Sequence, residues 1–366
     1  MIATTLVLLT LVAATRLCAQ EDGALKRYEY SAEKLGSPTR IIFYAASDAQ
    51  AQEAADAVWE RFDKIDDSLS DWRPESELIQ VCRAFETSEE PREISEDFRN
   101  VLAISRVLCE QTNRAFDPTV GPIVKLWRRS LYFHDRPPQK NLDMAKSCVG
   151  LDVWRLDEHG VWMKKGVRFD FGGIAKGYAL DKALETLQSH GIESALIDAS
   201  GDLRIGAAPP GTSGWRVGVS SLNKEPAFYC ELTNVGIASS GDANRYVEID
   251  GVRYSHIVDP RTGEPMTRRC VATVMAPNAT LADALASALC VLGVQECDVI
   301  DQLAKRGVEG EPFDVWEYLL YQAHEDANAP YDESNVDMVA TPGFAKLELT
   351  TRAQKTEQEL EPQVKE

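Results

Sequence analysis

The sequence lacks the short motifs by which many cofactor and metal sites are identified. It has no Cys-x-x-Cys pair, no Walker A sequence and no G-x-G-x-x-G run, which excludes the zinc sites and nucleotide-binding loops that these motifs form. Beyond Cys18 there are seven scattered cysteines, an odd number without a disulfide-framework pattern. We expect these seven to be buried small apolar residues.

Positive charge is also scarce. Against 58 Asp and Glu there are 39 Lys and Arg, and the net charge is −19 at pH 7. This balance argues against binding to nucleic acid or to anionic lipid, because both need basic patches. An anionic small ligand remains compatible with it, since a metal ion can bridge acidic residues to phosphate.

The N-terminal residues have the features of an export signal. Residues 2–14 are apolar but too short to span a bilayer, and Leu17-Cys18-Ala19 offers a small-residue cleavage site before Gln20. We expect residues 1–19 to be a signal peptide and the protein to be exported to an extracytoplasmic, periplasmic location. A lipid anchor on Cys18 and an uncleaved anchor are the alternatives, and either would attach the protein to a membrane only through its N-terminus.

The remaining pattern predicts a single α+β domain over residues 20–350, followed by a disordered charged tail at 351–366. Helical and hairpin signals alternate without a βαβ rhythm, so we expect a mixed, largely antiparallel sheet with packed helices. Helices are predicted at 48–65, 95–112 and 280–293, and strands at 39–44, 161–169, 195–197, 215–219, 228–232, 318–322 and 345–349. Residues 20–29 are expected to be a linker, 66–77 a loop and 143–153 irregular.

Asp250-Gly251 between alternating residues is a strong signal for a two-residue β-hairpin. The predicted register pairs Ile249 with Val252, Glu248 with Arg253, Val247 with Tyr254 and Arg245 with His256. His256 then lies at the end of a strand, directly before the Asp259-Pro260-Arg261-Thr262-Gly263 loop.

The stretch Asp170-Phe171-Gly172-Gly173-Ile174-Ala175-Lys176-Gly177-Tyr178 leads into an amphipathic helix that ends at His190-Gly191. A helix start offers free N–H groups and a partial positive charge, which favour phosphate, and glycine allows close approach to the backbone. The same glycines could serve turn geometry alone.

Asp283 and Ser287 are four residues apart on a predicted helix, so their oxygens share one face. They could ligate Mg²⁺ together with phosphate oxygens and a carbonyl. Alternatively, Thr280 and Asp283 could form a capping box.

Other candidates also have two interpretations. His256 could be a general base, a phosphate contact or a packed histidine. Asp117 could form a turn or belong to a loop that holds a planar ring. Trp72 could stack on an aromatic ligand or cover the edge of the core.

Eight blocks of the chain, in order, resemble the FAD:protein FMN transferase (ApbE) family. The resemblance spans residues 41–349 and is carried by 70–78, 115–122, 170–178, 200–202, 239–242, 254–263, 282–287 and 341–344. It implies an ApbE-like domain that cleaves FAD in a Mg²⁺-dependent reaction. FMN passes to a Thr of an acceptor flavoprotein subunit or domain of a redox system, and AMP leaves.

The resemblance also implies roles for individual residues. His256 and Asp283 would be catalytic. The metal would be held by Ala175, Asp283 and Ser287, with Ala286 close by. The FAD contacts would be Trp72, Ala115, Phe116, Asp117, Gly172, Tyr178 and Ile257.

Two departures from the family pattern are visible. Ser287 stands where the family has Thr, which keeps a hydroxyl ligand, and Leu35-Gly36-Ser37 stands where the family has Met-Gly-Thr at a flavin contact. Two other functions remain open: an FAD pyrophosphatase, in which water replaces Thr, and a non-catalytic periplasmic FAD-binding protein.

Overall fold

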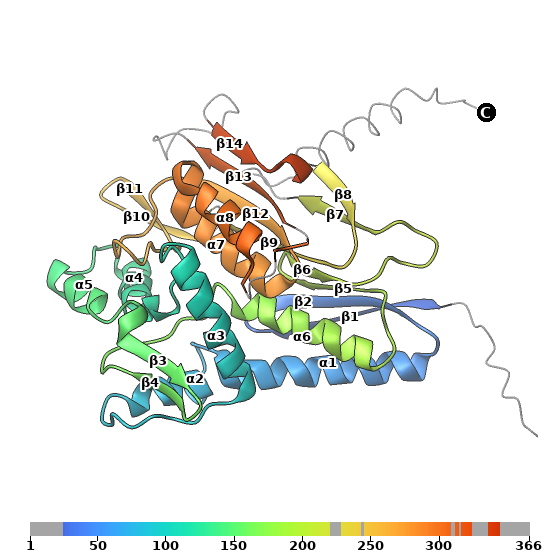
Figure 1. The fold of residues 1–366 in the computed structure, drawn as a ribbon, viewed down its shortest axis with the longest axis horizontal. Coiled ribbons are helices and arrows are strands. Elements are labelled where there is room, and N and C mark those ends of the chain that lie inside the picture. The colour runs from blue at the N-terminus through green and yellow to red at the C-terminus, as the bar shows by residue number, and fades with distance from the viewer. Residues whose placement is uncertain are drawn as a thin grey trace, which may run out of the picture.

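A computed structural model describes residues 25–219, 228–242, 245–308, 312–314, 316–323 and 336–344 (Figure 1). The predicted signal peptide at 1–19, the strand at 345–349 and the tail at 351–366 therefore lie outside the described residues.

The centre of the fold is an eight-stranded sheet whose strand pairs are all antiparallel. Its order is β1-β2-β5-β6-β9-β12-β13-β14. These strands are β1 (Lys26–Lys34), β2 (Ser37–Ala45), β5 (Ala195–Ala199), β6 (Asp202–Ile205), β9 (Val235–Gly241), β12 (Cys270–Ala276), β13 (Glu317–Ala323) and β14 (Val336–Ala340). The arrangement confirms the α+β class and the largely antiparallel sheet.

Three small hairpins lie outside this sheet. They are β3 (Trp154–Asp157) with β4 (Gly160–Met163), β7 (Trp215–Val219) with β8 (Phe228–Leu232), and β10 (Tyr246–Ile249) with β11 (Val252–Ser255). The β10–β11 register joins Ile249 to Val252, Glu248 to Arg253 and Val247 to Tyr254, as the Asp-Gly turn predicts.

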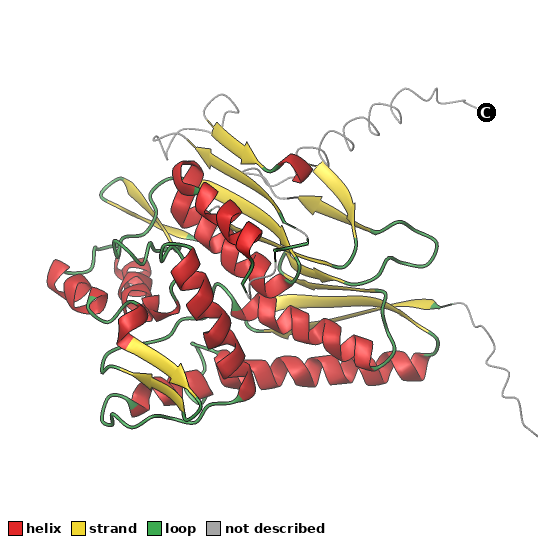
Figure 2. Cartoon of the chain, viewed as in Figure 1, coloured by secondary structure: helices red, strands yellow, loops and turns green. Residues whose placement is uncertain are grey.

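Helices α6 (Ala175–Ser189) and α7 (Ala279–Glu296) lie in front of the sheet in Figure 2, and α1 (Asp48–Leu69) runs below β1 and β2. The remaining helical elements are α2 (Glu77–Ala84), α3 (Glu96–Gln111), η1 (Pro118–Val120), α4 (Gly121–Phe133), α5 (Gln139–Lys146), η2 (Leu151–Val153) and α8 (Asp298–Arg306). Figure 1 shows that α2–α5 and the β3–β4 hairpin gather beside this layer.

Both faces of the sheet are covered, which explains why its strands contain continuous apolar runs. In β2, Ile41 packs into the core that includes the helices, whereas its neighbour Ile42 packs with Trp215 and Phe228 of the β7–β8 hairpin. A third apolar cluster joins α4 and α5 to the β10–β11 hairpin through Trp127 and Tyr254.

Helix α7 is long and apolar enough to cross a membrane by length and composition, yet 78% of that segment is buried inside the fold, as in a core helix. It begins at Asn278, whose side chain accepts from the Leu281 N–H at 2.9 Å. Gly293 interrupts the helix with φ +69, a conformation that favours glycine.

Several boundaries differ from the predictions. Residues 26–29 belong to β1 rather than to a linker, residues 77–84 form α2, and α5 occupies part of the segment 143–153. The predicted strand at 161–169 ends at Met163. Strands β9 and β12 were not predicted. Strand β12 is buried along its whole length, and its sequence lacks the apolar–polar alternation by which a half-buried strand is identified.

Gly177 lets α6 approach the start of α7. A Cβ on this residue would lie 2.1 Å from the Ala279 carbonyl oxygen and 2.8 Å from the Thr280 Cα. These are backbone atoms, which cannot move aside as a flexible side chain could. The close contact therefore fixes the distance between the two helices.

We predict that Gly177→Ala lowers the free energy of unfolding by about 2 kcal/mol, because overpacking forces the helices apart. Chemical denaturation would measure the loss. Ser189→Ala, at the exposed end of α6, should change stability by less than about 0.5 kcal/mol. Equal stability of the two variants would contradict the proposed contact.

Candidate functional site

The starts of α6 and α7 are joined by Asp181. Its carboxylate, on α6, accepts the Ala279 N–H at 2.9 Å and the Thr280 N–H at 2.8 Å, and it also accepts the Thr280 hydroxyl. Arg204 of β6 lies 2.9 Å from the same carboxylate. An acid from one helix thus satisfies the free N–H groups of another and fixes the orientation of α7.

Asp283 lies one turn further along α7 and is buried. Its Oδ2 accepts the Gly177 N–H at 3.1 Å. Burial, reinforced by the neighbouring Asp202 charge, raises the pKa of Asp283 to about 7, although the Lys176 charge opposes this shift. The capping-box alternative is wrong, because Asn278 caps α7 and Asp283 bonds to α6 instead.

Ser287 faces the glycine loop. A Cβ on Gly173 would lie 3.2 Å from Ser287 Oγ and 3.7 Å from the Phe116 ring, so these three predicted blocks meet at one point. Ser287 Oγ is also 3.3 Å from Ser240 Oγ of β9. Ala286 is buried beside it on α7, and Ala175 begins α6.

This donor set fits a hard cation. A buried carboxylate, a hydroxyl and a backbone carbonyl are the oxygen ligands that Mg²⁺ accepts. The raised pKa of Asp283 shows that its negative charge is poorly compensated by the chain itself. The described residues contain no cluster of three His, Cys, Asp or Glu that could hold a metal, so an ion here would need further ligands from substrate or water.

Lys176, which follows Ala175, forms an ion pair with Asp202 of β6. Asp202 is buried and also accepts the Ser239 N–H at 3.2 Å. The charges of Asp283 and Asp202 raise the pKa of Lys176 despite the opposing effect of burial. The lysine therefore stays charged at neutral pH.

His256 follows β11, as predicted, and is exposed on one side. Its Nδ1 lies 3.1 Å from the Arg245 carbonyl oxygen, which can only accept, so Nδ1 carries the proton. Desolvation by the surrounding protein lowers the pKa of His256 below its ordinary value of 6.5. At neutral pH the Nε2 atom is thus an unprotonated base.

Trp72 is 72% exposed and lies over Arg128 of α4, with the guanidinium 4.4 Å from the ring centre. Arg128 also binds Asp71 at 2.5 Å and Asp170 at 3.1 Å. Asp170 in turn accepts the Gly172 N–H at 2.9 Å. Arg128 therefore links the Trp72 loop to the glycine loop.

The segment from Ala115 to Asp117 is buried. Both oxygens of the Asp117 carboxylate are engaged, one by Thr119 and the other by Arg114. This is the turn-forming interpretation of Asp117, and a ligand would meet the backbone or the Phe116 ring rather than this carboxylate.

Two predicted flavin contacts occupy different surroundings. The Tyr178 hydroxyl donates to Asp97 at 2.7 Å and lies near Arg61 and Asn100, so this side chain points towards α1 and α3. Ile257 lies beside His256 and is held by hydrogen bonds to Ser255 and Met266.

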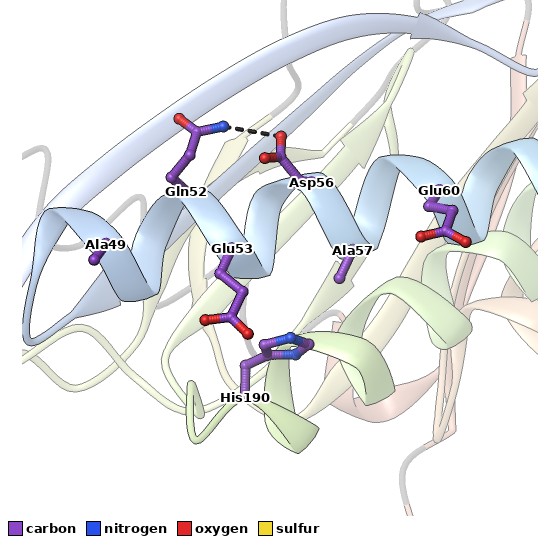
Figure 3. A pocket seen from close by; sticks show the side chains of 7 residues that line it. All are labelled: Ala49, Gln52, Glu53, Asp56, Ala57, Glu60 and His190. Atoms are coloured by element: carbon purple, nitrogen blue, oxygen red, sulfur yellow. Dashed lines mark hydrogen bonds between the residues drawn. The ribbon is translucent and has the colours of Figure 1, made fainter.

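A surface hollow of about 660 Å³ lies between α1 and the end of α6 (Figure 3). None of the predicted site residues lines it. Its lining includes Glu53, Asp56 and Glu60, whose charges would repel an anionic dinucleotide.

Four residues of the site region were not predicted as site residues: Lys176, Asp181, Asp202 and Arg128. Lys176 and Asp202 lie inside blocks that carry the resemblance, and each is a charged residue next to a glycine. That position could have marked them as candidate site residues. Arg128 gave no signal, because its partners are 57 and 42 residues away.

The comparisons with known proteins agree on one family. The ApbE family model matches residues 35–309. A FAD:protein FMN transferase of Vibrio cholerae is 32% identical over 240 residues, covering 63% of this chain and 71% of the relative. One from Escherichia coli K12 is 28% identical over 323 residues, covering 82% of this chain and 91% of the relative.

Solved structures show the same fold. The ApbE protein of Thermotoga maritima superposes with a TM-score of 0.73 and 29% identity, covering 88% of this chain and 99% of that one. The flavin transferase ApbE of Vibrio cholerae superposes with a TM-score of 0.74 at 24% identity, with the same coverage.

We predict that Asp181→Asn lowers the free energy of unfolding by about 3 kcal/mol, because it leaves the Arg204 guanidinium without its carboxylate. Glu185→Gln removes an exposed ion pair with Lys182 on the same helix and should cost less than about 1 kcal/mol. Urea titration of both variants would measure the difference. If Asp181→Asn lowered the free energy of unfolding no more than the control does, Asp181 would not be what holds α6 and α7 together.

Proposed function

The chain belongs to the ApbE family, and from this premise we propose that it transfers FMN from FAD to a threonine of an acceptor flavoprotein. The reaction requires Mg²⁺ and releases AMP. The observation that carries the proposal is the convergence of Asp283, Ser287 and the glycine loop, with Lys176 electrostatically linked to both Asp283 and His256.

Asp283, Ser287 and the Ala175 carbonyl would hold the metal ion. When bound, Mg²⁺ supplies positive charge that offsets the phosphate charges in the transition state. The chain adds its own contribution at the start of α6, where the positive end of the helix dipole favours the pyrophosphate. Gly172 and Gly173 leave room for the phosphates, because neither has a side chain.

The group transfer is a displacement at the phosphorus atom of the FMN half. The threonine Oγ forms a new P–O bond, and the bond from this phosphorus to the bridging oxygen breaks. AMP departs with the bridging oxygen. The threonine proton passes to Nε2 of His256, which the Arg245 carbonyl keeps in the correct tautomer.

One assay separates transfer from hydrolysis and from simple binding. The protein is incubated with FAD, Mg²⁺ and a threonine-containing acceptor domain, and both AMP and the flavin fluorescence of the denatured acceptor band are measured. Transfer gives AMP and a fluorescent band. AMP with free FMN but no labelled band would indicate a pyrophosphatase, and no AMP would indicate a binding protein.

We predict that Asp283→Asn lowers Mg²⁺-dependent AMP release by about a hundredfold, because the negative charge that holds the metal ion is lost even though an amide oxygen remains. Asp56→Asn, an acid in the hollow of Figure 3, is the control and should keep wild-type turnover. Turnover is measured from AMP production over a Mg²⁺ series. Wild-type turnover in Asp283→Asn would refute the metal assignment.

His256→Ala should bind FAD normally but transfer FMN at least about a hundredfold more slowly, since general base catalysis contributes that much. His159→Ala, at an exposed turn between β3 and β4, should not affect transfer. Flavin fluorescence titration and acceptor labelling measure the two properties separately. A normal labelling rate in His256→Ala would make the residue structural.

The pH profile offers a second test of the same residue. A base works only when unprotonated, and desolvation lowers the pKa of His256 below 6.5. At saturating Mg²⁺, which keeps Asp283 ionised, wild-type transfer should therefore be constant near neutral pH and fall as the pH drops below that lowered pKa. This acid limb should be absent from the residual rate of His256→Ala.

A further inference from the structure

Lys176 is the charged side chain that connects the parts of the site. It lies between Ala175, whose carbonyl is a proposed metal ligand, and Gly177, whose N–H binds Asp283. Its ammonium pairs with Asp202 on β6. Three separate elements, α6, α7 and β6, thus place one cation beside two buried carboxylates.

The ammonium is only partly enclosed. The Lys176 side chain is 29% exposed, whereas that of Asp202 is 4% exposed. Asp202 is its one side-chain hydrogen-bond partner within the part of the chain that the structure describes. An ammonium has three donors, so two remain available for an anion at the open side.

The Lys176 charge is felt by both functional side chains of the proposed reaction. It acts on Asp283, where it opposes the rise in pKa, and on His256, where it adds to the lowering of the pKa. The cation is therefore within electrostatic range of the proposed metal ligand and of the proposed base. The phosphoryl group that passes from FAD to threonine must come within reach of the same two residues.

The charge balance of the site also favours a cation beside Asp202 and Asp283. Asp202 and Asp283 together outweigh the single charge of Lys176. FAD adds one negative charge on each of its phosphates, and one divalent ion would compensate only for these. Without Lys176, Asp202 would lose its ion-pair partner and Asp283 would lose a stabilising charge, which is costly for buried carboxylates close to a pyrophosphate.

We propose that Lys176, held in place by Asp202, contacts the pyrophosphate of FAD directly and is a phosphate-binding residue of the site. This inference rests on the proposed function and adds a residue to it. Asp202 acts through Lys176 as a positioning residue, because its second oxygen is fixed by the Ser239 N–H. Lys176 then contributes to binding independently of the metal ion.

The test measures flavin binding by the full chain in EDTA, where no divalent ion contributes. FAD, FMN and riboflavin are titrated and their fluorescence is followed. Because riboflavin carries no phosphate, Lys176→Met should leave its affinity within about twofold of wild type. FAD affinity should fall by about tenfold or more, which corresponds to about 1.4 kcal/mol. Lys176→Arg, which keeps the charge, should restore most of it.

A second variant distinguishes a loss of phosphate binding from a loss of folding. Lys176→Met leaves Asp202 buried without its partner, so the double variant Lys176→Met with Asp202→Asn removes both charges while the amide oxygen can still accept from Ser239. It should show the same selective loss of FAD affinity. Lys182→Met is the matched control, since Lys182 is on the same helix, is 24% exposed and pairs with Glu185.

The outcomes are distinct. Unchanged FAD affinity in Lys176→Met and in the double variant would overturn this inference and leave the proposed function standing. An equal loss of riboflavin and FAD affinity would also overturn it, because it would mean a structural role. Failure of the wild-type protein to bind any of the three flavins in EDTA would overturn this inference, and failure to bind them with Mg²⁺ present as well would overturn the proposed function.

Discussion

The close contact between Gly177 and the first turn of α7 is the constraint on which the site depends. Because this residue has no side chain, its N–H can reach Asp283 across 106 positions of sequence. The contact brings the start of one helix against the start of another, which places two positive dipole ends close together. Asp181 holds that arrangement, and the carboxylates around it need the cations that the site provides.

Helix α4 contacts both the hairpin before His256 and the loops that carry Trp72 and Asp170. Its residue Trp127 stacks on Tyr254 of that hairpin, and the next residue, Arg128, contacts Trp72 and Asp170. The indole N–H of Trp127 also donates to the Gly263 carbonyl at 3.0 Å. A shift of α4 would therefore move the base and the flavin-side loops together.

The sequence predicted those features of the fold that depend on a few adjacent residues. The Asp-Gly turn determined the hairpin register, and Gly191 marked the end of α6, because both depend on a few adjacent residues. It could not decide the role of Asp283, since the choice depended on whether α7 began at Asn278 or Thr280. The pair of Lys176 and Asp202 and the bridge made by Arg128 arise from tertiary packing, which no pattern along the chain encodes. Asp117 and Tyr178 were assigned from the resemblance, and the structure shows that both side chains have partners within the protein.

The strand order of the central sheet follows the order of the chain, from β1 at one edge to β14 at the other. Each strand after β1 therefore pairs with one that precedes it in the chain, so the sheet can form in one direction from its N-terminal edge. Helix α6 enters this growing layer before β5 and β6, and α7 enters it after β12. A chain that ends before α7 therefore lacks Asp283 and Ser287, the two side chains of the proposed metal site.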